Sequence, residues 1–378
     1  MNKVITALAI LASAVSLPGC SGGGSGDKNN TQDTAEIYRP VRVALYTPSD
    51  ASETRLHILN RDDTLTTCTA EASGDLSDCS VQDLEDADVV HQMVVNPRTG
   101  SIYLLQAHTD SVLICGDSQN ALSSCTATTG GDVLKDPSFI ALNADGSAAY
   151  LTNEDGTLAV CQLAADGTFS SCTATDVNGT LDTPVAVGVV SGDYGTYAYL
   201  LNGDSKPIIT ACTLAPAGMP SACHAQNNEL FSVATAMAFS PDGQYLYVGN
   251  LDDNLAICRI ERDASLSSCH AVDSGDQELF AGIMDIAVDA AGANAYVVNG
   301  GNSSITHCKL EAGGAEFADC RPYNIEGFEF TTDLALLEQA GSSSLFIASM
   351  SNDSIYGCPL DAKGGFTDSC IATRFSEQ

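Results

Sequence analysis

Short segments in which apolar and polar positions alternate recur along the chain, separated by turn residues. One repeat shows the pattern clearly: Ser138-Phe-Ile-Ala-Leu-Asn is followed by Ala148-Ala-Tyr-Leu-Thr-Asn, Leu158-Ala-Val-Cys-Gln-Leu and Thr168-Phe-Ser-Ser-Cys-Thr-Ala. Alternation over so few residues is typical of half-buried β-strands. Four such strands in succession, joined by short turns, predict a four-stranded antiparallel sheet.

Cysteines repeat with the same period as these strand groups. Fourteen of the fifteen form seven sequential pairs: Cys68/Cys79, Cys115/Cys125, Cys161/Cys172, Cys212/Cys223, Cys258/Cys269, Cys308/Cys320 and Cys358/Cys370. The first cysteines of successive pairs are 47, 46, 51, 46, 50 and 50 residues apart. A period of this length is typical of one propeller blade. The sequence therefore predicts an all-β fold, a seven-bladed β-propeller of four-stranded blades.

Each pair should form a disulfide within its blade. Asp166-Gly167 lies midway between Cys161 and Cys172, which suits a two-residue hairpin turn and places the two sulfurs opposite each other. No Cys-x-x-Cys occurs in the chain, so structural zinc is disfavoured. The first blade begins near Val41 and the last ends at its own fourth strand near Thr373, so we expect no blade built from both termini.

The N-terminus resembles an exported lipoprotein precursor. Residues 1–19 combine a short basic start with an apolar run that ends at Leu17-Pro-Gly-Cys20, which predicts a signal peptide and lipidation of Cys20. Residues 20–37 then form a flexible linker, and residues 38–378 form the propeller. An ordinary secretory signal is the alternative. We expect a cell-envelope location, on the outer membrane and facing the periplasm or the surface, where cysteine pairs persist as disulfides.

A recurring word marks the second strand of several repeats, as in Tyr150-Leu-Thr-Asn, Tyr199-Leu-Leu-Asn, Tyr247-Val-Gly-Asn and Tyr296-Val-Val-Asn. With the Ala238-Phe-Ser-Pro-Asp-Gly type of segment before it, this word resembles the Tyr-Val-Thr-Asn repeat of the lactonase-like seven-bladed propeller family. The resemblance covers about residues 40–378 and implies the fold. It also implies hydrolysis of sugar lactones as one possible activity, although no catalytic residue of that family is matched here. The tyrosines and asparagines themselves are expected to pack between sheets and to cap loops.

The chain is strongly acidic, with 48 acidic and 15 basic residues and a formal net charge of −33. This charge disfavours nucleic acid as a partner. Loops between second and third strands and loops between blades open on one face of a propeller, and 22 of the acidic residues fall in these loops. They are either a solvated rim or a surface for a cationic ligand or a basic envelope protein.

Polar residues also interrupt the innermost strands, where propeller ligands usually bind. Met284-Asp285-Ile and Thr332-Asp333-Leu begin two of these strands, and His91 with Gln92 holds the matching place in another. Asp285, Asp333, Gln92 and His91 are therefore the candidate binding residues. An aspartate pair could share a proton or bind a metal, and hydrated channel carboxylates are the alternative.

No cofactor is expected from the sequence. Calcium stays open, because loop carboxylates are abundant although no full calcium loop occurs. No Ser-His-Asp order, Gly-x-Ser-x-Gly elbow or phosphate loop is present, so catalysis is uncertain and less favoured. The sequence favours a lipid-anchored binding or scaffold module, with a lactonase-like hydrolase as the alternative and a structural envelope protein as the third.

Overall fold

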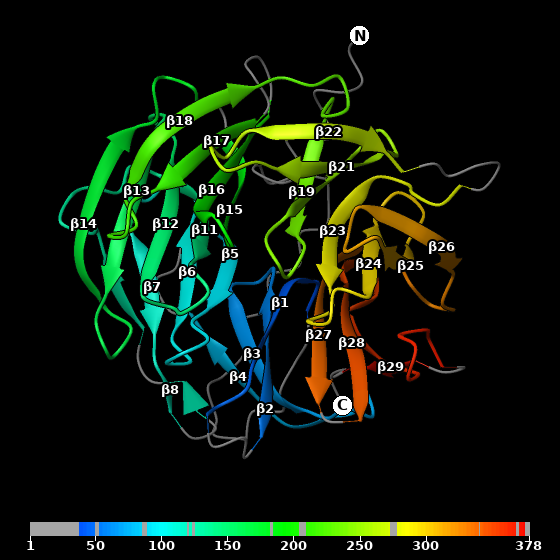
Figure 1. Ribbon diagram of the computed structural model, residues 1–378. Helices are drawn as coiled ribbons and strands as arrows, with labels where there is room; N and C mark the ends of the chain where they lie inside the picture. Colours follow the sequence, from blue (N-terminus) through cyan, green and yellow to red (C-terminus); the bar gives the residue numbers. More distant parts are fainter. Residues whose placement is uncertain are drawn as a thin grey trace, which may run out of the picture.

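The computed structural model describes residues 38–49, 53–84, 89–118, 121–122, 125–181, 184–203, 209–272, 278–339, 341–367 and 370–374. The predicted signal peptide, Cys20 and the linker to residue 37 lie outside these ranges. Within them, the chain forms seven four-stranded antiparallel sheets and one small two-stranded hairpin. Figure 1 shows the sheets arranged around a common centre, with β1, β5, β11, β15, β19, β23 and β27 innermost.

The strands follow the chain in order, four to a blade. Blades 1 to 3 contain β1 (Pro40–Tyr46), β2 (Thr54–Asn60), β3 (Thr64–Ala70) and β4 (Leu76–Asp83); β5 (Val90–Val95), β6 (Ile102–Gln106), β7 (Val112–Cys115) and β10 (Thr126–Thr128); and β11 (Pro137–Leu142), β12 (Ala148–Asn153), β13 (Thr157–Leu163) and β14 (Phe169–Asp176). The hairpin β8 (Asp117–Ser118) and β9 (Ala121–Leu122) is inserted before β10.

Blades 4 to 7 repeat this order with no further strand among their described residues, and a 3-10 helix, η1 (Met350–Asn352), lies between β28 and β29. They contain β15 (Pro184–Gly192), β16 (Gly195–Asn202), β17 (Ile209–Leu214) and β18 (Pro220–Gln226); β19 (Ala234–Phe239), β20 (Tyr245–Asn250), β21 (Leu255–Ile260) and β22 (Leu266–Ala271); β23 (Ile283–Val288), β24 (Asn294–Asn299), β25 (Ser304–Glu311) and β26 (Glu316–Tyr323); and β27 (Thr331–Gln339), β28 (Ser342–Ser349), β29 (Ser354–Leu360) and β30 (Ile371–Thr373). The predicted fold is confirmed. Blades 1 and 7 each use their own four strands, so a non-covalent seam closes the ring.

Each blade carries one disulfide, which links its third strand to its fourth strand or to the residue directly before it. All fourteen cysteines are bonded to the partners that their spacing predicts: Cys68–Cys79, Cys115–Cys125, Cys161–Cys172, Cys212–Cys223, Cys258–Cys269, Cys308–Cys320 and Cys358–Cys370. The predicted pairing is confirmed. Each disulfide thereby fixes the outermost strand of a blade, which has an exposed edge.

The register around the disulfide differs between blades. In blades 3 and 4 the two cysteines are direct partners, as predicted, with Cα atoms 4.0 and 4.1 Å apart, the close approach of a non-hydrogen-bonded pair. In blades 1, 5 and 6 the register shifts at the disulfide itself, so the second cysteine lies at a bulge: Cys79, Cys269 and Cys320. The residue before each of these three has a left-handed backbone: Asp78, Ser268 and Asp319. One extra residue therefore opposes the first cysteine of the pair.

In blades 2 and 7 the second cysteine lies outside the fourth strand. Cys125 directly precedes β10 and Cys370 directly precedes β30, and each of these strands has only three residues. The predicted register, which applies to the pairs separated by eleven positions, is confirmed in blades 3 and 4 and wrong in blades 1 and 5. Bulges in blades 1, 5 and 6 and short outer strands in blades 2 and 7 change the backbone pairing, while the disulfides themselves are kept.

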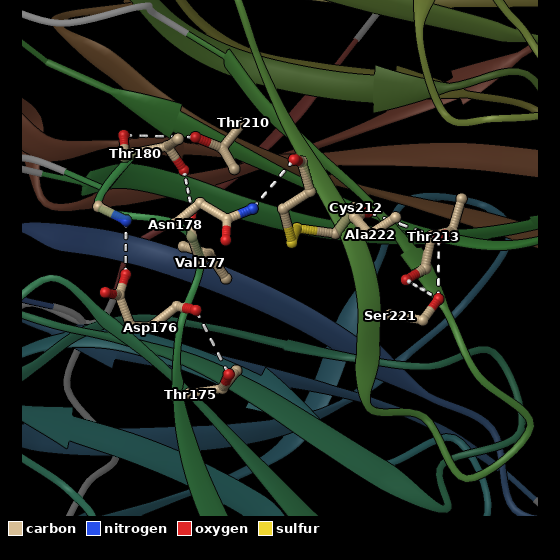
Figure 2. The surroundings of a disulfide bond; sticks show 12 residues. Thr175, Asp176, Val177, Asn178, Thr180, Thr210, Cys212, Thr213, Ser221 and Ala222 are labelled. Carbon is tan, nitrogen blue, oxygen red and sulfur yellow. Dashed lines mark hydrogen bonds between the residues drawn. A yellow bond between two sulfur atoms is a disulfide. The ribbon is translucent and has the colours of Figure 1, made fainter.

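The surroundings of Cys212–Cys223 show how an outer strand is held on its other side (Figure 2). Asn178, in the loop from β14 to β15, donates from Nδ2 to the Cys223 carbonyl oxygen at 3.2 Å. Two residues later, the Thr180 carbonyl oxygen accepts a hydrogen bond from the Thr210 hydroxyl at 3.4 Å. The loop that enters blade 4 is therefore fastened to both strands that the disulfide joins.

The hairpin between third and fourth strands differs from the predicted two-residue turn. In blade 3, the Gly167 N–H donates to the Ala164 carbonyl at 3.1 Å, and the Ala164 N–H donates to the Thr168 carbonyl at 2.8 Å. Gly167 lies in the left-handed region with φ of 85°, and the register shifts between Gln162 and Leu163. The two-residue prediction is wrong because the glycine occupies the left-handed position of a longer turn that ends in a bulge.

Apolar side chains fill the space between adjacent blades. The buried hydrophobic residues form seven clusters, one at each junction between neighbouring blades. The seam has its own cluster, in which Val43, Leu56 and Ile58 of blade 1 meet Leu337 and Phe346 of blade 7. Packing of mainly aliphatic residues with tyrosine therefore continues around the whole ring, although the chain has no tryptophan.

Side chains on one face of the ring add hydrogen bonds at five of the junctions between blades. This face, the entry face, carries the loops between blades and those between second and third strands. At five junctions a side chain from a second-to-third-strand loop accepts the backbone N–H that starts the next blade, at 2.6–2.9 Å: Asp63 from Val90, Asp110 from Asp136, Asp253 from Gly282, Ser303 from Phe330 and Asp353 from Arg39. We call these contacts rim latches.

Candidate functional site at the axial ring

A bulge at the same place in every innermost strand positions the candidate site. The register shifts around the second residue of each strand, at residues 41, 91, 138, 185, 235, 284 and 332. A bulge adds one residue and redirects the side chains that follow. The seven residues directly after the bulges are structurally equivalent, and we call them the axial ring: Arg42, Gln92, Phe139, Ala186, Ala236, Asp285 and Asp333.

The axial ring is polar on one side and apolar on the other. Its polar members belong to blades 6, 7, 1 and 2, which are consecutive because β23 contacts β27, β27 contacts β1 and β1 contacts β5. The apolar members, Phe139, Ala186 and Ala236, belong to blades 3, 4 and 5. The fold thus brings the predicted Asp285, Asp333 and Gln92 onto one polar arc near the entry face, and it adds Arg42.

Asp285 and Asp333 form a pair that links three blades. The Asp285 carboxylate accepts the Ile286 N–H on Oδ1 at 2.9 Å and the Leu334 N–H of the next blade on Oδ2 at 3.2 Å. In the same way, Asp333 Oδ2 accepts the Val43 N–H across the seam at 2.7 Å. The side chain of Asp333 is also hydrogen-bonded to that of Asp285.

The electrostatic environment of Asp333 favours its neutral form. Burial has the largest effect and the adjacent Asp285 carboxyl adds to it, so the pKa of Asp333 lies well above its ordinary value. The Arg42 guanidinium and the Val43 N–H act in the opposite direction, with smaller effect. Two carboxyl groups in contact cannot both ionise readily, so the pair is suited to hold one proton between them.

Arg42 and Gln92 complete the polar arc. Arg42 Nε donates to Gln92 Oε1 at 3.3 Å, and its Nη1 donates to the Val41 carbonyl at 3.3 Å. These contacts orient the guanidinium, whose charge reaches Asp333. Sequence reasoning missed Arg42. The signal was present, because Val41-Arg-Val begins the first strand as Met284-Asp-Ile begins the sixth.

His91 has a different place from the other predicted residues. It is the bulged residue of β5, and its Nε2 lies 3.1 Å from the Ser138 carbonyl oxygen of blade 3. Burial, above all, lowers the pKa of His91. Threonines at the equivalent bulges also form hydrogen bonds to the next blade: Thr235 donates to the Ile283 carbonyl at 2.6 Å and Thr332 to the Pro40 carbonyl at 3.4 Å. The structure therefore places His91 at a blade junction beside the axial ring.

Among the described residues, no group of three or more histidine, cysteine, aspartate or glutamate side chains is placed to hold a metal ion. The aspartate pair offers two carboxyl groups, with a guanidinium close by. Of the predicted rim acids, Glu85, Asp86, Asp88, Asp182, Asp204, Asp273 and Asp276 lie outside the described residues. Four others, Asp63, Asp110, Asp253 and Asp353, serve as rim latches. Part of the acidity of the entry face thus has a structural role.

A separate hollow of about 430 Å³ lies on the opposite face, close to the seam. Its lining is mainly polar and includes Glu53, Glu71, Asp78 and Gln339. None of the axial-ring residues lines it. Within the described residues, no helix is long and apolar enough to cross a membrane.

Comparison with known proteins shows the fold and leaves the family open. No known protein family and no curated protein matches the sequence. Among solved structures, the periplasmic gluconolactonase of Pseudomonas aeruginosa is similar, with a TM-score of 0.58, 15% identity and coverage of 88% of this chain and 95% of that one. A candidate 6-phosphogluconolactonase from Bacteroides fragilis has a TM-score of 0.55 and 14% identity, with coverage of 75% of this chain and 87% of that one.

Proteins of other kinds have the same architecture. Kuenenia stuttgartiensis hydrazine synthase gives a TM-score of 0.58 at 14% identity, covering 93% of this chain and 99% of that one. A protein of unknown function from Desulfotomaculum acetoxidans gives 0.60 at 11% identity, covering 83% and 93%. The fold thus occurs with several functions. This chain is a seven-bladed β-propeller that resembles, among others, structures of lactonases.

Proposed function

We propose that this chain is an exported binding module that holds a small ligand at the axial ring. The observation that carries the proposal is the division of seven equivalent positions into four consecutive polar residues and three consecutive apolar ones. Ligand sites combine apolar surface with a few convergent polar groups. Here Arg42 and Gln92 supply donors and an amide, Asp285 supplies an acceptor, and Phe139 offers an aromatic face on the other side.

A second candidate, hydrolysis of a lactone, is favoured by the aspartate pair. One protonated and one ionised carboxyl side by side can act as acid and base. The Arg42 guanidinium could stabilise negative charge on a carbonyl oxygen during attack by water. The likeness to two solved structures whose names refer to lactonases supports a test of this chemistry, at identities that show the fold alone.

One experiment separates the two candidates. The soluble domain is titrated calorimetrically with gluconolactone, 6-phosphogluconolactone and the corresponding open-chain acids, and lactone hydrolysis is followed in parallel. A double variant, Asp285→Asn with Asp333→Asn, should weaken binding at least tenfold, about 1.4 kcal/mol. The control, Asp145→Asn with Asp242→Asn, removes two acids from the opposite face and should leave binding unchanged.

The outcomes assign the function. Binding without turnover supports the binding module, and turnover that the double variant abolishes supports the hydrolase. Equal effects of the two double variants would show that the carboxylates act only through general charge, and would overturn the axial ring as the site.

The cellular address and partner are part of the proposal. Seven disulfides favour an oxidising compartment, and the Cys20 motif suggests lipid anchoring to the envelope, with the exposed rim acids facing a basic envelope protein. Cys20→Ser should release the protein from the membrane fraction or block its processing while the propeller still folds. Fractionation identical to wild type would refute the anchor. Attraction of a basic partner to the rim should weaken with added salt.

A further inference from the structure

The two carboxyl groups of the aspartate pair have unequal sets of hydrogen-bond donors. Asp285 accepts backbone N–H groups on both oxygens, from Ile286 and from Leu334. Asp333 accepts one backbone N–H, from Val43, on Oδ2. Hydrogen bonds from fixed N–H groups stabilise the ionised form of a carboxyl, so the donor arrangement favours the charge on Asp285.

Asp333 Oδ1 accepts no backbone N–H among the described residues, so it is available for the contact with Asp285. Two carboxyl side chains can share a hydrogen bond only if one of them carries a proton. Since both Asp285 oxygens already accept N–H groups, the proton is best placed on Asp333, from which it is donated to Asp285. Burial of Asp333 acts in the same direction, because it penalises the charged form.

The charge of the polar arc also depends on the side chains of the neighbouring strands β1 and β5. Arg42, on β1, brings the positive charge that reaches Asp333, and Gln92, on β5, is neutral. His91, also on β5, points to the Ser138 carbonyl, and its lowered pKa keeps it uncharged at neutral pH. One carboxylate and one guanidinium therefore remain, and their charges cancel.

We infer that Asp333 holds a proton that it donates to Asp285, so that the polar arc has no net charge and suits an uncharged, hydrogen-bonding ligand in an otherwise acidic protein. The statement about the ligand rests on the function proposed above. The statement about the proton does not, because it concerns the unliganded protein. The two can therefore fail separately.

The location of the proton is tested by carbon-13 NMR of the soluble domain labelled at aspartate Cγ. Asp285→Asn and Asp333→Asn assign the two resonances by their disappearance, and circular dichroism verifies that each variant is folded. At neutral pH the Asp333 carbon should have the chemical shift of a protonated carboxyl, and the Asp285 carbon that of a carboxylate. Carboxylate shifts at both positions, or a protonated Asp285, would overturn the inference.

Electrophoretic mobility of the native protein tests the charge of the pair. Because the inference places the single negative charge of the pair on Asp285, Asp333→Asn should keep that charge and migrate like wild type. Asp145→Asn, at an exposed turn on the opposite face, should lose one negative charge and migrate measurably more slowly toward the anode. If Asp333→Asn migrates like Asp145→Asn, Asp333 is ionised in the wild type and the inference is wrong.

Discussion

Four tyrosines on second strands connect one blade to the next through their hydroxyl groups. Tyr199, Tyr247 and Tyr296 of the recurring word, and Tyr103 on β6, donate to the carbonyl oxygens of Ala264, Gly314, Gly364 and Gly167, respectively, at 2.5–3.0 Å. Each acceptor lies in the left-handed region, in the third-to-fourth-strand hairpin of the following blade. The expectation that these tyrosines pack between sheets is confirmed, and the hydroxyl adds a specific bond.

Tyr247→Phe should destabilise the propeller modestly. The change removes the donor to the buried Gly314 carbonyl and keeps the ring that packs against Phe317, so we expect a loss of about 1 kcal/mol in the free energy of unfolding. Chemical denaturation measures it. Tyr245→Phe is the matched control, because no side-chain hydrogen bond of Tyr245 is found within the described part of the chain. An equal loss in both variants would contradict the role of the hydroxyl.

At the aspartate pair, Asp333→Asn should change how stability depends on pH. A raised pKa in the folded state means that the wild type is most stable below the ordinary aspartate pKa, and loses stability as the pH rises toward the folded value. Asparagine keeps an acceptor for the Val43 N–H and does not titrate. The variant should therefore match wild type near pH 4 and become progressively more stable than wild type above it.

Thermal melts across this pH range measure the difference. The stability difference between Asp145→Asn and wild type should change with pH in the opposite direction, because hydrogen bonds from Ser147 lower the pKa of Asp145. The ionised Asp145 carboxylate stabilises the fold at pH values above its ordinary pKa, so Asp145→Asn should lower the free energy of unfolding increasingly as the pH rises. A constant difference between Asp333→Asn and wild type at every pH would contradict the account of the pair.

At the scale of the element, the blade was predictable and its fine geometry was not. The cysteine period and the strand alternation predicted four strands and a disulfide in each repeat, because both are set by local spacing. The bulges at the second residue of each innermost strand leave no such signal. Arg42 lies at the position equivalent to Asp285 and Asp333, which the sequence pattern at the start of the first strand indicated and sequence reasoning overlooked. The site was therefore predicted only in part.

Removal of one disulfide tests how much an outer strand depends on it. Cys212→Ala with Cys223→Ala opens a loop closed over a sequence separation of 11 residues, for which the chain-entropy contribution is about 2–3 kcal/mol. We expect that loss in the free energy of unfolding, together with faster amide exchange confined to β18. Asn178 still holds the Cys223 backbone, so the strand should remain paired. Loss of the whole fold would contradict the view that the disulfide stabilises only the outer strand of its own blade.

At the scale of the whole molecule, the seam relies on the same contacts as the other junctions. Asp353 latches Arg39, Asp333 accepts the Val43 N–H and Thr332 donates to the Pro40 carbonyl. On the opposite face, Ser344 donates to the Ala72 carbonyl at 2.6 Å. These bonds add to the apolar packing at the seam, and they depend on long-range juxtaposition that no local sequence pattern reveals.

Thr332→Val should loosen the ring more than the equivalent change Thr235→Val. Each variant removes a hydroxyl that bonds to the next blade, but only at the seam is there no chain connection between the two blades. Hydrogen exchange should therefore quicken in β1 and β27 of Thr332→Val, and less in β19 and β23 of Thr235→Val. Equal effects at both junctions would show that closure does not depend on the seam.

The most direct test of the central claim, a small-ligand site on the axial ring, is calorimetric titration of the soluble domain with the ligand panel described above. The account predicts that a ligand binds the wild type and the opposite-face variant, Asp145→Asn with Asp242→Asn, equally well. It predicts at least tenfold weaker binding to Asp285→Asn with Asp333→Asn. Undiminished binding to that second variant would place the site elsewhere and contradict the claim.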